Sequence, residues 1–437
     1  MATAPDGKPW DYSLGVTMDT AGGGARSLQL CFNRGDDANT VAANFCAAHG
    51  VGMDSFEQVR DFILSAKAKR GDTDVGGGGG GGGAVLAPRA RTHFPSGAFL
   101  TLDAVDWRKV QPKLEEFNAA LAAAGAPAAL SDAELGGIKA LIAVLAQTSR
   151  WHATSVPLPA VRALFAKCLQ QWPVAQLFPA LDTLRVLLCH PEGAAAVAEA
   201  AGGGFVAGAT ARIAALRSRP PGDKEARAAV LLTARCLFNA WHQPPTRALL
   251  HAALPAVMDA TSDLLQHEAP AVRFAGAVLL HNTAHALGAQ ALAAWQAAAT
   301  AATRPSTASS FSAAALPASA SAAAAAAPPE SAHVEQLLGL VVEGLQALRP
   351  PPPVPAGAGA PTDAAAPAAD AAGGDDAVLK LLVALGTVVL AVGPSAAQTA
   401  RALELEDALA QLPGALFPHS APIREAVAEL LPLIRAP

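Results

Sequence analysis

The sequence has 437 residues, of which 52% are hydrophobic but only 5% aromatic, and its net charge is −5. Much of the hydrophobicity is alanine, which contributes little area to a core, and no run of about 20 bulky apolar residues predicts a membrane span. The charge gives no general attraction to nucleic acid or to acidic membranes. We therefore expect a soluble, helical and partly disordered protein.

The N-terminus and the cysteines favour the cytosol and nucleus. Met1–Tyr12 contains prolines and aspartates instead of the basic start and apolar run of a secretory signal. The cysteines are odd in number, lie far apart and form no CxxC pair, so neither a disulfide framework nor a zinc cluster is indicated. We expect reduced core thiols at Cys31, Cys46, Cys168, Cys189 and Cys236.

Residues 1–70 predict a small α+β domain. Apolar and polar residues alternate over Tyr12–Met18 and again over Leu28–Phe32, which predicts two strands joined in a hairpin through the turn-rich Asp19–Gly24. Apolar residues then recur three and four apart over Thr40–Cys46 and Phe56–Ile63, as on amphipathic helices. Asp54 or Ser55 stands where a helix cap is expected.

Three low-complexity segments divide the rest. The run Gly76–Gly83 has no side chains that could join a core, so residues 71–91 predict a flexible linker. Stretches rich in alanine and proline, at about 298–330 and 350–374, predict disordered insertions between helices.

From Phe94 onward the apolar residues follow a helical period. Successive helices with short Pro or Gly connections favour an all-α solenoid of the armadillo or HEAT type over 92–437. An irregular helical bundle remains the alternative. The predicted helices are Val110–Leu121, Asp132–Leu145, Leu158–Leu169, Phe178–Leu188, Ala209–Leu216, Lys224–Trp241, Thr246–Leu265, Ala271–Ala286, Val334–Leu348, Asp376–Ala391, Ala397–Leu405 and Pro422–Ile434.

Four stretches of the first 70 residues form a series: Gly7–Tyr12, Leu28–Asn33, Ala43–Phe45 and Phe56–Ile63. In this order they resemble the PFU domain, which implies a ubiquitin-binding module. The resemblance places the binding phenylalanines at Phe45 and Phe62. Their helical spacing is equally typical of core residues, so both interpretations remain open.

Five stretches of the helical part form a second series: Trp172–Pro173, Phe178–Arg185, Ala234–Asn239, Leu279–Asn282 and Lys380–Thr387. They resemble the PUL domain, the armadillo-like C-terminal module of the phospholipase A2-activating protein family. The resemblance implies binding to the C-terminal tail of the valosin-containing AAA ATPase. Family members normally begin with a WD-repeat propeller, whereas this sequence starts at the PFU-like segment, so we expect a short form or a truncated gene model.

Three cations lie inside strongly apolar helix segments, namely Arg185, Arg235 and Lys380. Each could simply pack or pair with a nearby acid such as Asp182. The resemblance implies instead that Arg185 and Lys380 hold an acidic tail in a basic groove, and we place Arg235 with them. Lys380 stands where the family has arginine, and lysine offers a carboxylate only a point charge.

Two asparagines, Asn239 and Asn282, lie near the ends of apolar helices. Each could bind a peptide backbone in the same groove or satisfy neighbouring carbonyl groups.

Catalytic signatures are missing from the sequence, which contains no GxSxG, HExxH or P-loop motif. Cys46 and His49 lie close together but lack a third group to orient the base, and His281 with His285 lacks further metal ligands. We therefore expect a non-catalytic adaptor without a cofactor, whose partners are ubiquitin and the ATPase tail. The rival interpretation is a solenoid scaffold with no ubiquitin role, and a pull-down with mono-ubiquitin separates the two.

Overall fold

The computed structural model describes residues 2–3, 9–19, 25–33, 41–42, 45, 56–69, 93–220, 222–302, 329–348, 368–413, 417 and 420–435. The chain divides into two compact units, Met1–Ala90 and Arg91–Pro437. Each unit has its own hydrophobic core. The predicted linker 71–91 and most of both predicted insertions lie outside the described residues.

The first unit contains the predicted hairpin. Strands β3 (Tyr12–Asp19) and β4 (Ala25–Phe32) pair antiparallel with Tyr12 opposite Phe32, and those two rings stack at 4.6 Å. Two short strands, β1 (Ala2–Thr3) and β2 (Pro9–Trp10), pair beside them, and α2 (Phe56–Lys69) confirms the second predicted helix. Of the first predicted helix, residues 41, 42 and 45 are helical. The rest of it, with Asp54 and Ser55, lies outside the described residues.

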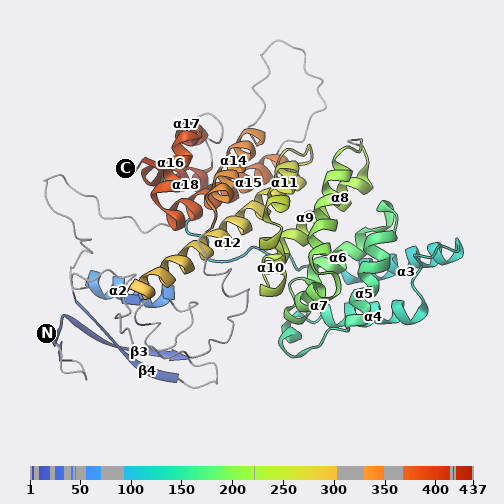
Figure 1. The fold of residues 1–437 in the computed structure, drawn as a ribbon, viewed down its shortest axis with the longest axis horizontal. Coiled ribbons are helices and arrows are strands. Elements are labelled where there is room, and N and C mark those ends of the chain that lie inside the picture. Colours follow the sequence, from blue (N-terminus) through green and yellow to red (C-terminus); the bar gives the residue numbers. More distant parts are fainter. Residues whose placement is uncertain are drawn as a thin grey trace, which may run out of the picture. The chain divides into compact units, whose positions relative to one another are not determined.

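The second unit is a solenoid-like stack of helices. Helices α6, α9, α12 and α15 pack against one another in succession and form its inner layer (Figure 1). The α-helices are α3 (Trp107–Ala123), α4 (Asp132–Leu145), α5 (Leu158–Ala163), α6 (Phe178–Leu187), α7 (Pro191–Ala201), α8 (Gly203–Arg217), α9 (Lys224–Ala240), α10 (Pro244–Ala252), α11 (Leu254–Leu265), α12 (Pro270–Ala302), α14 (Ser331–Ala347), α15 (Ala368–Val392), α16 (Pro394–Ala402), α17 (Leu405–Gln411) and α18 (Ala421–Arg435). Shorter helical turns are η2 (Thr148–Ala153), η3 (Leu164–Leu169) and η4 (Val174–Gln176).

All twelve predicted helices are present, with differences at their ends. The predicted helix Thr246–Leu265 is two helices, α10 and α11, because Pro255 at the start of α11 cannot continue the hydrogen bonding of the preceding turn. Helices α7 and α17 were not predicted. α12 runs to Ala302 and α15 begins at Ala368, so both enter the predicted insertions.

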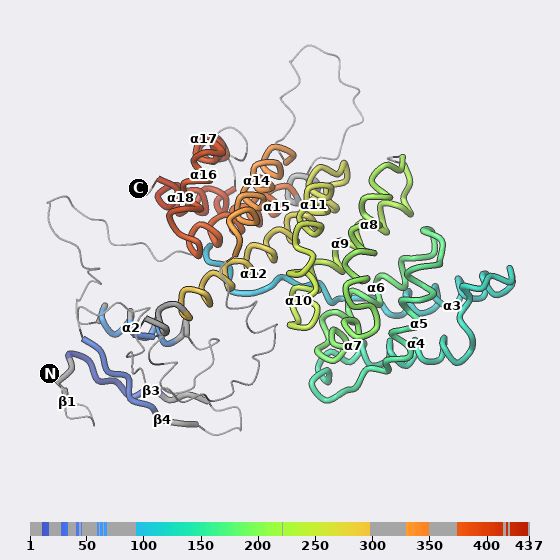
Figure 2. Tube along the Cα trace, in the orientation of Figure 1, coloured from blue at the N-terminus to red at the C-terminus, as the bar shows by residue number. Residues whose placement is uncertain are grey.

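One expectation is wrong: the helical pattern does not begin at Phe94. Residues 93–106, which we call the strap, contain no helix, and the first helix of this unit begins at Trp107. Pro95 and Gly97 disfavour a helix here, and the apolar side chains of the strap pack on the inner layer instead. Figure 2 shows the strap as an extended trace running along the helices toward α3.

Within the described residues, no single helix is both long and apolar enough to cross a membrane. Helices α7 and α8 meet that criterion only as a pair, by length and composition, and the pair is bent by 85°.

Gly386 of α15 provides a test of how the strap packs. A Cβ atom added there would lie 2.5 Å from Cγ of the buried Phe94 ring. We expect Gly386→Ala to destabilise the protein by about 1–3 kcal/mol through overpacking. Gly339→Ala in α14, where nothing lies within 4 Å, should instead stabilise it by up to about 1 kcal/mol. Urea unfolding of the two variants measures both values, and equal stabilities would contradict this packing.

Candidate functional site

The strap is held by two buried asparagines, each of which binds one strap residue at both its N–H and its C=O. Asn282 of α12 accepts from Leu100 N–H and donates to Leu100 O, both at 2.8 Å. Asn239 of α9 does the same for Leu102, both at 2.9 Å. Each amide also donates to a helix carbonyl, that of Phe238 or of Arg185. Both asparagine side chains therefore make all of these hydrogen bonds within the protein.

Arg185 of α6 fixes the strap further along. Its Nη1 donates to Leu102 O and its Nη2 to Ala104 O, both at 2.7 Å, while its Nε pairs with Asp182 at 2.6 Å. The residue is 4% exposed. Because all three nitrogens have partners, the guanidinium is bound to the chain itself.

The N-terminal end of the strap is held through Ser96. Its N–H donates to Thr387 Oγ1 at 2.9 Å, and its hydroxyl lies 2.8 Å from His281 Nε2. Burial lowers the pKa of His281 to about 4, and the nearby Lys380 lowers it as well. The imidazole is therefore neutral at pH 7.

Between these points the Phe99 ring of the strap fills an aromatic site. It lies parallel to Trp241 at 6.5 Å, meets His285 edge-on at 4.5 Å and carries the Arg247 guanidinium 4.4 Å from its centroid. Arg247 also donates to the carbonyls of Trp241 and His242. The strap is thus anchored by apolar and cation–π contacts as well as by hydrogen bonds.

Two cations near the strap differ from Arg185. Arg235 of α9 and Lys380 of α15 are half-buried, and within the described part of the chain neither has a hydrogen bond or ion pair from its side chain. Burial lowers the pKa of Arg235, and so does the like charge of Arg185, whereas Asp182 raises it. The pKa effects place Arg235 near Arg185 and Lys380 near His281, toward opposite ends of the strap.

The five residues predicted to bind the tail therefore lie along the strap, and their contacts divide them into two groups. Arg185, Asn239 and Asn282 are bonded to the strap, and the alternatives of pairing with Asp182 and of satisfying neighbouring carbonyl groups are both realised. Tail binding at these three residues stays a prediction. Arg235 and Lys380 retain the character expected of a basic site. The strap was not predicted from the sequence. Pro95 and Gly97, which disfavour a helix, were the residues that could have indicated it.

In the first unit, the structure separates the two phenylalanines. Phe45 is 5% exposed and packs in the core. Of its two interpretations, the core residue is therefore the correct one, and Phe45 is not an exposed contact. Phe62 is 41% exposed on α2, whereas Val59 and Ile63 of the same helix are buried. Among the described residues of this unit, Phe62 is the large apolar side chain that is exposed.

Among the described residues, no group of three or more His, Cys, Asp or Glu side chains could hold a metal ion. Cys31, Cys168, Cys189 and Cys236 are free. Burial raises the pKa of Cys168 and of Cys189 to about 12, so these thiols are unreactive at neutral pH. Cys46 and His49 lie outside the described residues.

Two family models match the chain. The PUL domain matches residues 94–429, and the PFU domain, described as PLAA family ubiquitin binding, matches residues 2–70. No curated protein matches.

Several solved structures are similar at 13% identity. A PFU-PUL domain pair of Saccharomyces cerevisiae Doa1/Ufd3 has a TM-score of 0.39, with 97% of this chain and 98% of that chain covered. A structure of PUL and PFU domain has a TM-score of 0.40, with 98% and 100% covered. A structure described as PUL and PFU(mutate) domain has a TM-score of 0.40, with 97% of this chain and 98% of that chain covered.

Asn239→Leu should loosen the strap. It removes the acceptor for Leu102 N–H and the donor to two carbonyls, and each buried polar group left unsatisfied costs about 1–3 kcal/mol. We expect amide hydrogen exchange at Leu100 and Leu102 to accelerate about tenfold or more. Asn118→Leu is the matched control, because Asn118 binds Leu130 through the same pair of bonds away from the strap. Equal protection of Leu102 in both variants would contradict the role of Asn239.

Proposed function

Because this chain belongs to the PUL-domain family and carries a PFU domain, we propose that it is a non-catalytic adaptor in ubiquitin-dependent protein degradation. The two domains support a ubiquitin-related adaptor role in general. In the specific form that we propose, the PFU domain binds ubiquitin and the PUL domain binds the C-terminal tail of the valosin-containing AAA ATPase. The reduced, buried thiols fit action in the cytosol and nucleus.

The pair of cations Arg235 and Lys380 is the observation that carries the tail proposal. A half-buried cation without a partner is poorly solvated, so a carboxylate that reaches it gains more than one at a fully exposed lysine. The strap near which they lie has a backbone fixed by Asn239, Asn282 and Arg185. An acidic tail would therefore bind beside the strap.

Phe62 carries the ubiquitin proposal. Its ring is the exposed part of a helix whose other face, with Val59 and Ile63, is buried in the small core. An exposed aromatic ring on a rigid helix can enter an apolar contact with little loss of entropy. Joined in one chain, two weak contacts reinforce each other, since the second becomes intramolecular.

The alternative is a solenoid scaffold that binds other peptides and has no ubiquitin role. The site near the strap suits either proposal. The two proposals are therefore distinguished by whether the first unit binds ubiquitin. Retention of the chain on immobilised mono-ubiquitin favours the adaptor, and no retention favours the scaffold.

Phe62→Asp should reduce ubiquitin binding at least tenfold while the far-UV circular dichroism and melting temperature stay nearly unchanged, because the ring is exposed. Ser65→Asp is the matched control, since it adds the same charge to an exposed position of α2 and should bind as the wild type does. Binding that is unchanged in Phe62→Asp, or reduced equally in both, would sink the site assignment.

Arg235→Ala should weaken binding of the ATPase tail peptide by about tenfold, since a charged hydrogen bond contributes about 1.5–3 kcal/mol. Lys380→Arg should preserve or strengthen binding, because guanidinium offers a planar pair of donors. Arg150→Ala, an exposed position away from the strap, is the control. Calorimetric titration of the full chain measures all three, and indifference to the changes at both Arg235 and Lys380 would place the tail elsewhere.

A further inference from the structure

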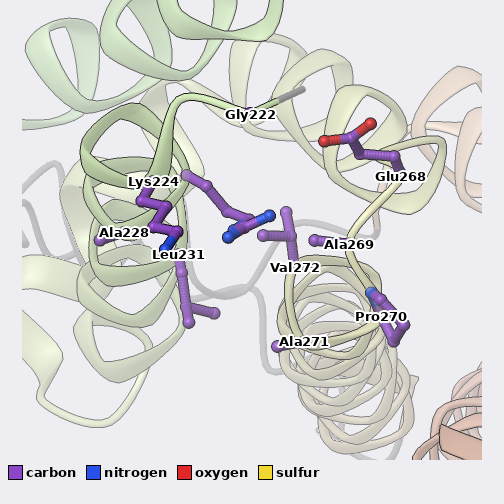
Figure 3. Close-up of a pocket in the computed structure, with 10 residues that line it drawn as sticks. Gly222, Lys224, Ala228, Leu231, Glu268, Ala269, Pro270, Ala271 and Val272 are labelled. Atoms are coloured by element: carbon purple, nitrogen blue, oxygen red, sulfur yellow. The ribbon is translucent and has the colours of Figure 1, made fainter. Parts of the chain in front are cut away.

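A second cleft lies at the opposite end of α9 from the strap. It has a volume of about 940 Å³ and is lined by the beginnings of α9 and α12, with Lys224, Ala228 and Leu231 on one wall and Glu268, Ala269 and Val272 on the other (Figure 3). Lys224 and Asn239 are 15 residues apart on α9, about 22 Å along the helix. A ligand in this cleft is therefore separate from one beside the strap.

The floor of the cleft is apolar, whereas one wall carries a double positive charge. Ala228, Leu231 and Ala269 supply small aliphatic surfaces, whereas Val272 is fully buried. Lys224 and Arg227, both on α9, also line the cleft. Within the described part of the chain, neither side chain has a hydrogen bond or ion pair.

The neighbouring cations are already neutralised or bound. Arg217 pairs with Asp263, Arg219 lies 3.9 Å from Asp223, and Arg273 donates to the carbonyls of His267 and Glu268. The carboxylates of Asp223 and Asp263 are therefore already paired with arginines. Lys224 and Arg227 are left facing a single exposed carboxylate, that of Glu268, so the open charge of the cleft is positive.

A smaller pocket of about 300 Å³ extends the cleft. It shares Arg227 and Glu268 with the larger one and reaches the ends of α8 and α11. The N-termini of α9 and α12 add the partial positive charge of a helix start. The two pockets adjoin at Arg227 and Glu268, and we call them together the depression.

We propose that this depression binds an acidic peptide segment, with carboxylates along Lys224 and Arg227 and an apolar side chain over Leu231 and Ala269. The apolar floor favours a peptide over phosphate or a polyanion, which would gain nothing from it. The charge pattern sets the orientation of the segment, because the acidic side chains must avoid Glu268.

The probe is a fluorescent twelve-residue peptide of alternating glutamate and leucine, acetylated and amidated so that it has no terminal carboxylate for the site near the strap. We expect Lys224→Glu/Arg227→Glu in the full chain to weaken binding at least tenfold, and Glu268→Gln to strengthen it two- to threefold. Added salt should weaken the wild type, since the cations are partly exposed. Glutamates near the start of α9 suit the helix dipole, so the double variant should fold.

Arg150→Glu is the matched charge control, and Arg235→Ala tests the site near the strap; both should bind the probe as the wild type does. Unchanged binding by the double variant would overturn the proposal, and so would an equal loss in Arg235→Ala. Displacement of the probe by inorganic phosphate or heparin as effectively as by unlabelled peptide would also overturn it, in favour of a general anion site. Since this site does not include Arg235 or Lys380, failure here leaves the tail proposal intact.

Discussion

The structure of the large unit depends on the capture of an extended segment by side chains from four consecutive inner helices. Asn239, Asn282 and Arg185 are buried, and without the strap each would lose two hydrogen bonds and keep only its bond to a helix carbonyl or to Asp182. The strap in turn would have bare N–H and C=O groups at Leu100 and Leu102. Because burying an unsatisfied polar group is costly, each side of this contact requires the other. The strap therefore belongs to the fold of the large unit.

The parts of the fold that depend on neighbouring residues were predictable. The helix Asp132–Leu145 was predicted with its actual ends, and Ser131 with Glu134 forms a capping box there. The hairpin was likewise visible from alternation over Tyr12–Met18. The strap was not, because its conformation is set by contacts such as that between Leu100 and Asn282, 182 positions away. Local periodicity carries no information about such a partner.

The candidate sites were predicted by residue type better than by role. Cations and asparagines inside apolar helices marked residues that lie along the strap, since a buried polar group needs a partner. Sequence could not distinguish Arg185, which is saturated by Asp182 and two carbonyls, from Arg235, for which the described chain offers no such partner. Phe45 and Phe62 likewise share a helical spacing, and only packing shows that Val59 and Ile63 take the inner face of α2 and leave Phe62 outside.

In the proposed complex the strap stays fixed and the acidic tail binds beside it. Amide hydrogen exchange of Leu100 and Leu102, with and without saturating tail peptide, tests this most directly. Because Asn239 and Asn282 keep their bonds to the strap in this account, we predict that exchange at both amides is unchanged or slower in the complex. Faster exchange on addition of the tail would contradict it, since the tail would then displace the strap from the asparagines and take its place.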